Sequence, residues 1–253
     1  MKGEVPHELL GFHNVLVISD LDRTMATSAA GWASLEIILN KIIGRKMLPS
    51  EVVRAVYRIA SVGLEYAENP NGESVLFSER VWDAFNKEFL YEEGDTEKFA
   101  LAEAKKALPI IGTKLFLKEI TSNAAFSYKA LISLNVPPYV EAWKRNLGFD
   151  IAVPHAYDKA KKALSIYDSF IMNCPVYSAH EEKIGVFVLG DSDSDMDMRF
   201  AIENAAEDKN HRNVSVYGLK ARNHLALEGG NYFRVVPSSS DKKGHDYTLR
   251  FSY

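Results

Sequence analysis

Cysteine is almost absent from this chain. Among 253 residues there is a single cysteine, Cys174, so the chain cannot form an internal disulfide. No cysteine and histidine spacing resembles a zinc site, and the seven histidines are scattered along the sequence. We therefore expect a protein of a reducing compartment, without a histidine-based metal centre.

Long hydrophobic runs are missing as well. No apolar stretch approaches the roughly 20 residues that a helix needs to cross a bilayer. The first residues, MKGEVPHELLGFHN, lack the apolar core of a signal peptide. These absences predict a cytoplasmic protein with no membrane partner.

A surplus of positive charge is also lacking. Lysine and arginine number 30 against 34 aspartates and glutamates, for a formal net charge of −4. A nucleic-acid-binding domain needs a clustered basic surface, whereas short basic runs such as residues 159–162 are typical of solvated helix faces. We expect no nucleic-acid partner.

Hydrophobic residues make up 47% of the chain, which is ordinary for a globular protein. A short, mostly β-branched apolar run predicts a buried strand at residues 15–18. Further strands are predicted at residues 129–135, 149–153, 186–191, 214–219 and 232–236. In the second half they alternate with helical segments such as residues 139–147, which Gly148 ends. This alternation predicts a mainly parallel sheet with helices on both faces.

The last residues alternate apolar and polar side chains from residue 247 to residue 253. That pattern predicts an edge strand with one buried face. A strand that binds a partner is the alternative, and a plain edge strand is the preferred interpretation.

The region between about residues 28 and 108 has a different pattern. It contains no convincing strand, and its apolar residues recur at helical spacing. Helices are predicted at residues 32–43, 51–64 and 75–91. We interpret residues 28–108 as an all-helical subdomain inserted into an α/β core formed by residues 1–27 and 109–253.

Two of the predicted strands end on aspartate. Asp20 closes one strand and is followed by Asp22, and Asp191 closes another and is followed by Asp195. Parallel strands deliver their last side chains to the same edge of the sheet, where ligands bind. Carboxylates gathered there raise one another's pKa, and a hard cation removes that cost. The pattern predicts a magnesium site, because Mg²⁺ prefers oxygen ligands and few protein groups.

Two simpler interpretations apply to these stretches. Paired aspartates after a strand are often only a turn, which would be the better interpretation of either stretch alone. The run DSDSDMD could also be a calcium-binding loop. That loop would require Gly at its sixth position and Glu at its twelfth, where this chain has Met196 and Ile202.

Together the two stretches favour phosphoryl transfer. A carboxylate can attack phosphorus and form an aspartyl-phosphate, while a second carboxylate protonates the leaving alcohol and later activates water. A metal ion offsets the repulsion between the anionic nucleophile and the phosphate. A hydroxyl and an ammonium group would be needed to hold the phosphoryl oxygens.

These residues resemble the signatures of a known family. VISDLDRT resembles the DxDx[TV] motif of the haloacid dehalogenase superfamily, and VLGDSDSD resembles its GDxxxD motif, in the same order and strand context. The run ALISLN resembles the family's strand that ends in Ser or Thr. The resemblance covers residues 15–27 and 109–220. It implies a Rossmann-like, three-layer α/β/α core with an inserted helical cap, as in the phosphoserine-phosphatase-like and β-phosphoglucomutase-like branches.

The resemblance also implies roles for individual residues. Asp20 would be the nucleophile and a magnesium ligand, and Asp22 the general acid and base, with its backbone carbonyl on the metal. Asp191 would be a further ligand, and Asp195 would orient the metal site. The phosphate-binding residues would be Ser133, Thr24, which shapes the turn, and a lysine.

That lysine lies between the second and last motifs in the family, usually where a helix starts. The candidates here are Lys159, Lys161, Lys162 and Lys183. Lys159 fits a helix start best, although it lies farther from Gly190 than the family pattern implies. At least two of the four are solvated surface lysines under the simplest interpretation.

The leading hypothesis is a magnesium-dependent phosphatase, a phosphoric monoester hydrolase acting on a small phosphorylated metabolite. Phosphotransfer to another acceptor, as in a mutase, is a second hypothesis. A catalytically silent scaffold that binds a phosphorylated ligand or a protein is a third. Dehalogenation is disfavoured by Asp22, which dehalogenases lack, and the absence of membrane helices excludes a transport ATPase. Phosphoserine is disfavoured as substrate, because no acidic residue follows the first motif before Glu36.

Overall fold

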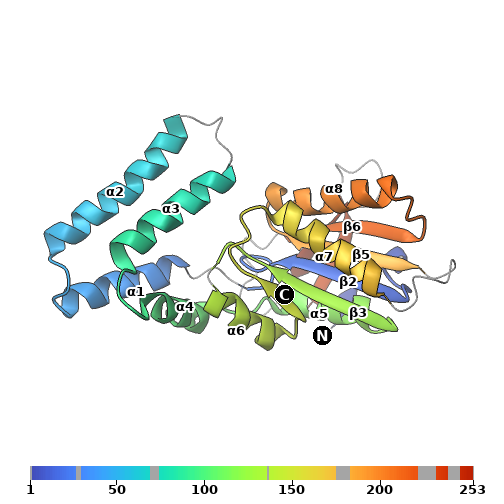
Figure 1. The fold of residues 1–253 in the computed structure, drawn as a ribbon. Helices are drawn as coiled ribbons and strands as arrows, with labels where there is room; N and C mark the ends of the chain where they lie inside the picture. The colour runs from blue at the N-terminus through green and yellow to red at the C-terminus, as the bar shows by residue number, and fades with distance from the viewer. Residues whose placement is uncertain are drawn as a thin grey trace. The chain divides into compact units, whose positions relative to one another are not determined.

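The computed structural model describes residues 2–26, 30–68, 74–135, 137–174, 183–221, 232–238 and 246–252. Contacts between Cα atoms divide the chain into two compact units (Figure 1). One unit comprises Met1–Thr27 with Leu108–Tyr253, and the other comprises Ser28–Ala107. The first unit contains every residue for which a catalytic or metal-binding role is expected.

The first unit is built on one eight-stranded sheet, in the order β1-β7-β8-β6-β5-β2-β3-β4. The strands are β1 (Lys2–Glu4), β2 (Asn14–Asp20), β3 (Phe126–Ile132), β4 (Ile151–Val153), β5 (Ile184–Gly190), β6 (Val214–Ala221), β7 (Tyr232–Pro237) and β8 (Asp246–Ser252). All pairings are parallel except that of β7 with β8. The predicted mainly parallel α/β core is confirmed.

Helices cover both faces of this sheet, in a three-layer arrangement (Figure 1). Its helices are α5 (Ile111–Thr121), α6 (Pro137–Leu147), α7 (Lys159–Asn173) and α8 (Asp193–Asp208), with a short 3-10 helix at His7–Leu9. Alternate side chains of the central strands face opposite layers. Val186 and Val188 pack in the cluster formed with α7 and α8, whereas Phe187 contacts Phe116 of α5 from the other face.

The order of strands in the sheet contradicts one prediction. Residues 247–253 were expected to form an edge strand, but β8 lies inside the sheet, between β6 and β7. The edges of the sheet, among the residues described, are β1 and β4. Alternating side chains reveal which face of a strand is buried, and they carry no information about whether another strand pairs beyond it.

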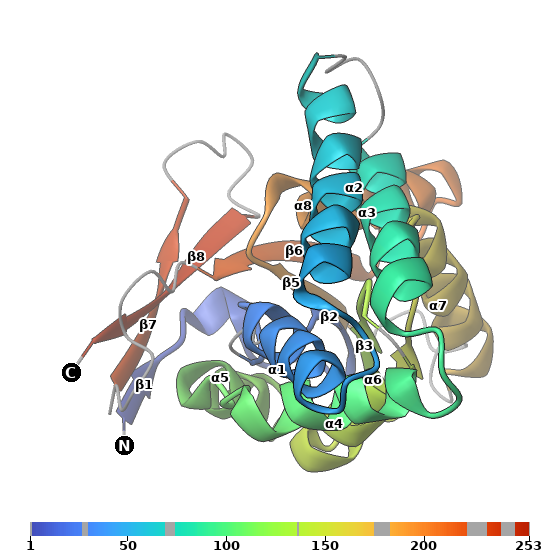
Figure 2. The same ribbon diagram turned by 90° about the vertical axis from the view of Figure 1, so that its left-hand side faces the viewer.

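The second unit consists of α1 (Ala30–Ile43), α2 (Pro49–Glu68), α3 (Ser74–Phe89) and α4 (Asp95–Lys106), coloured from blue to green in Figure 2. Its core gathers apolar side chains that recur at helical spacing: Ile37, Val52, Ala55, Phe85, Phe89, Leu90, Phe99 and Ala102. A buried ion pair adds to this core, because Lys41 Nζ lies 2.5 Å from Asp95 Oδ2 and both residues are less than 5% exposed. None of the described helices in either unit is long and apolar enough to span a membrane.

Candidate active site

Asp20 lies at the carboxyl end of β2, which pairs with β3 on one side and β5 on the other. The strand is buried along its whole length, and Asp20 itself is only 4% exposed. A tight turn follows, closed by bonds from the amides of Met25 and Ala26 to the carbonyl of Leu21. Thr24 lies buried in this turn, and its hydroxyl donates to Asp20 Oδ2 over 3.4 Å.

Asp191 and Asp195 come from the junction of β5 and α8. The Ser192 hydroxyl and the Asp195 carboxylate form a capping box that begins α8. Asp195 Oδ2 also accepts the backbone amide of Asp191 over 3.2 Å. Gly190 permits this close packing, because a Cβ there would lie 2.1 Å from Asp195 Cβ.

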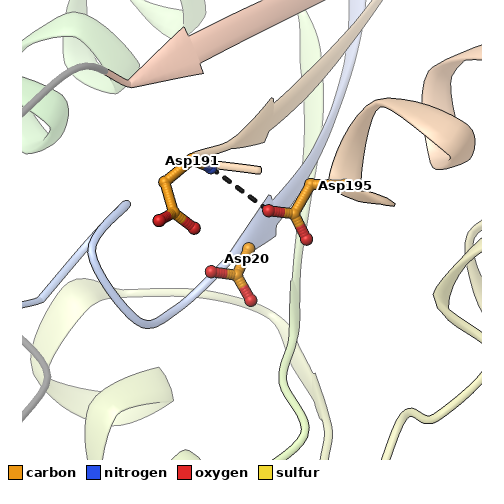
Figure 3. A group of neighbouring side chains, drawn as sticks. All are labelled: Asp20, Asp191 and Asp195. Atoms are coloured by element: carbon orange, nitrogen blue, oxygen red, sulfur yellow. Dashed lines mark hydrogen bonds between the residues drawn. The ribbon is translucent and has the colours of Figure 1, made fainter. Parts of the chain in front are cut away.

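The three aspartates converge at one point. Carboxylate oxygens of Asp20, Asp191 and Asp195 all lie within 4.8 Å of one another. Figure 3 shows them directed toward a common space from the ends of β2 and β5 and the start of α8. A group of hard oxygen donors at this spacing could hold a divalent cation.

Lys159 joins two of these carboxylates. It is the first residue of α7, whose N-cap Asp158 accepts the amide of Lys161 over 2.9 Å. Its ammonium lies 2.8 Å from Asp20 Oδ1 and 2.6 Å from Asp195 Oδ1. The side chains of Lys161, Lys162 and Lys183, the other candidates, are exposed.

Asp22 is surrounded by hydrogen-bond donors. Its Oδ2 accepts from the Ser133 hydroxyl over 3.5 Å and from the Asn135 side-chain amide over 3.3 Å. Its Oδ1 accepts from the Tyr139 hydroxyl over 3.4 Å. The sequence patterns did not indicate that Asn135 and Tyr139 belong to this site. Tyr139 was not singled out because an aromatic residue on a helix is more often part of a core.

Burial dominates the electrostatics of the carboxylates. It raises the pKa of Asp20 to about 8, against the effect of the Lys159 ammonium, and the Asp195 and Asp22 carboxylates raise that pKa further. Burial also raises the pKa of Asp191, and Asp195 acts in the same direction.

The pKa values of Asp22 and Lys159 are shifted as well. Burial raises the pKa of Asp22, an effect that the hydrogen bond from Asn135 opposes. Burial alone would lower the pKa of Lys159, but the Asp20 and Asp195 carboxylates raise it above its ordinary value. The site therefore combines several crowded acidic groups with a single firmly protonated ammonium.

Comparisons with known proteins show similarity at the level of three-dimensional structure. No protein-family model and no curated protein matches the chain. A phosphoserine phosphatase holding an analogue of the phospho-aspartyl intermediate matches at 13% identity and a TM-score of 0.49, over 81% of this chain and 85% of that one.

Two further solved structures match over most of their lengths. A β-phosphoglucomutase from Pyrococcus sp. strain ST 04 matches at 13% identity and a TM-score of 0.45, over 87% of this chain and 91% of that one. A haloacid dehalogenase-like hydrolase from Bacteroides fragilis matches at 14% identity and a TM-score of 0.44, over 88% and 96% of the two chains. These three matches, at 13–14% identity and TM-scores of 0.44–0.49, are likenesses in fold.

Proposed function

We propose that this chain is a magnesium-dependent phosphatase of the haloacid dehalogenase type, which hydrolyses a small phosphorylated metabolite through an aspartyl-phosphate. One observation carries the proposal: the buried Asp20 carboxylate lies within reach of Asp191, Asp195 and the Lys159 ammonium. A nucleophile, a cation site and an anion-binding group then share one edge of the sheet.

The donor set fits magnesium. The three clustered aspartates offer only carboxylate oxygens, and burial and crowding raise the pKa of Asp20 to about 8 even with the Lys159 ammonium beside it. A divalent cation would offset that cost and favour the ionised carboxylates. Asp20, Asp191 and the backbone carbonyl of Asp22 would hold it, with Asp195 orienting the site. When bound, the ion would neutralise charge on the phosphoryl group.

The residues of the chain account for each transfer of atoms. An Asp20 oxygen attacks phosphorus while the ester P–O bond breaks, and Asp22 gives its proton to the leaving alcohol oxygen. Asp22 then takes a proton from the water that attacks the aspartyl-phosphate, which releases phosphate and restores Asp20. Lys159 and Ser133 hold phosphoryl oxygens during both steps, and Thr24 holds the turn that presents Asp20 and Asp22.

Release of inorganic phosphate from phosphorylated metabolites and an aryl phosphate tests this function. We expect release with Mg²⁺, none above background with EDTA, and a loss of at least about 10³-fold in Asp20→Asn, which removes the nucleophile but keeps its shape. Asp208→Asn, an exposed aspartate at the end of α8, is the matched control and should keep full activity.

Two results would contradict the proposal. One is undiminished phosphate release by a folded Asp20→Asn protein. The other is no release from any compound by a wild-type protein that binds the same compounds, which would favour a silent phospholigand-binding scaffold. Phosphoserine belongs in the panel as a compound from which we expect little phosphate release. The first acidic residue after the first motif is Glu36, too far along the chain for the residue that would hold the substrate amine.

A further inference from the structure

The Asp22 carboxylate receives donors on both of its oxygens. Tyr139 occupies Oδ1, while Asn135 and Ser133 share Oδ2. Asn135 and Ser133 belong to the connection between β3 and α6, and Tyr139 lies in the first turn of α6. Asp22 itself lies in the turn after β2. The Asp22 carboxylate therefore ties the turn after β2 to the loop after the neighbouring strand β3.

Ser133 cannot serve Asp22 and a phosphoryl group with the same proton. A hydroxyl has one hydrogen to donate, and the Ser133 oxygen already accepts the backbone amide of Asn135 over 3.0 Å. Its contact with Asp22, at 3.5 Å, is the longest of the three. When the Ser133 hydroxyl donates to a phosphoryl oxygen instead, Asp22 keeps the hydrogen bonds from Asn135 and Tyr139.

Tyr139 is well suited to fix the orientation of the Asp22 carboxyl group. Its side chain is 0% exposed, and its ring packs edge-on against Trp143, with ring centroids 6.4 Å apart. A buried ring held in this way has little freedom to swing its hydroxyl. Asn135 is partly buried and approaches the other oxygen of the same carboxylate. Two fixed donors on the two oxygens define the plane of the carboxyl group.

We propose that Tyr139 and Asn135 are positioning residues that aim the Asp22 carboxyl group at the leaving oxygen of the substrate. This inference rests on the proposed phosphatase function. In the step concerned, an Asp20 oxygen forms a bond to phosphorus as the ester P–O bond breaks, and the proton of Asp22 moves to the departing oxygen to give the alcohol. A carboxyl group that rotates freely would seldom point its proton at that oxygen.

The test compares two aryl phosphates that differ in how much their leaving oxygen needs a proton. Phenolate is a basic leaving group, whereas 2,4-dinitrophenolate departs without protonation. For Tyr139→Phe and Asn135→Ala with Mg²⁺, we expect kcat/KM on phenyl phosphate to fall about tenfold and on 2,4-dinitrophenyl phosphate by less than about twofold. The parameter kcat/KM covers the steps up to departure of the leaving group.

Tyr167→Phe is the matched control. It also removes the hydroxyl of a fully buried tyrosine, but that hydroxyl contacts His211 rather than Asp22, so neither substrate should be affected. Asn135→Ala lies outside any helix or strand and provides a second test if Tyr139→Phe does not fold.

Equal losses on the two substrates, or no loss on either, would overturn the positioning role while leaving the phosphatase function intact. A wild-type protein that releases phosphate neither from these two compounds nor from any phosphorylated metabolite that it binds would overturn both. The two failures are therefore distinguishable within one set of assays.

Discussion

Gly190 illustrates at the scale of one residue how tightly the site is packed. A Cβ at this position would meet Asp195 at 2.1 Å, so Gly190→Ala must displace the start of α8. We expect this change to lower the free energy of unfolding by about 1–3 kcal/mol, the usual cost of overpacking. It should also weaken Mg²⁺ binding, because Asp195 moves. Urea unfolding measures the first effect and calorimetric titration with Mg²⁺ the second.

Gly11→Ala separates backbone strain from crowding. Gly11 has a φ of 81°, and no atom lies within 4 Å of a Cβ placed there. Its substitution should cost about 1–2 kcal/mol through the left-handed backbone alone and leave the Mg²⁺ affinity unchanged. Equal affinity losses in the two variants would contradict the role given to Gly190.

Sequence patterns predicted some residues of the site and missed others. Asp20 and Asp191 were expected at the ends of two buried strands, and the structure places Asp20 at the end of β2 and Asp191 directly after β5, which ends at Gly190. Tyr139 carried no such signal, because its helical spacing is that of any core aromatic residue. Its contact with Asp22 joins residues 117 positions apart, and no local pattern encodes such a meeting.

At the scale of elements, α7 and α8 pack on the same face of the sheet. The buried Tyr167 hydroxyl of α7 contacts Nδ1 of His211, which follows α8, over 2.7 Å. Burial lowers the pKa of His211, the nearby Lys209 acts in the same direction, and Asp168 opposes both. The folded protein therefore favours the neutral imidazole.

The lowered pKa of His211 predicts a pH dependence of stability. The unfolded chain takes up a proton on His211 near its ordinary pKa of 6.5, before the folded protein does. The contribution is thus fully present above that pKa and is lost as the pH falls below it. Between about pH 7.5 and pH 5.5, the wild-type free energy of unfolding should fall more than that of His211→Gln. Parallel declines in urea unfolding would rule out this contribution.

The strand β8 shows what element patterns leave open. Its alternating side chains correctly predicted a strand, and the expected edge position was wrong. β7 pairs with it on the far side, and β1, from the other end of the chain, pairs with β7. Which strands become neighbours depends on pairing between distant segments, which alternation does not record.

At the level of the whole molecule, the division into two units predicts that a destabilising substitution in one unit leaves the stability of the other unchanged. Lys41→Met leaves the buried Asp95 without its closest cation and should destabilise the helical unit by about 3 kcal/mol. Hydrogen exchange should accelerate in α1–α4 and stay unchanged in β2 and β5. Acceleration of similar size in both units would show that they unfold together.

Lys46→Met provides the control for this prediction. Its ammonium lies 2.5 Å from Glu92, but the side chain is 50% exposed. An exposed ion pair is screened by water and contributes little. We expect only a slight change in exchange for this variant, even though it removes the same charge from the same unit.

Local patterns in the sequence were enough to predict strands β2 to β8 and several of the helices, and to indicate that Asp20 and Asp191 stand where buried strands end. These features follow from local patterns of apolar side chains, turns and caps, which act over a few residues. The tertiary structure alone decided that Lys159 meets Asp20 across 139 positions, that Tyr139 meets Asp22, and that β8 lies inside the sheet. Those outcomes depend on how complete elements pack, since contact between distant residues is set by the whole core rather than by any one stretch.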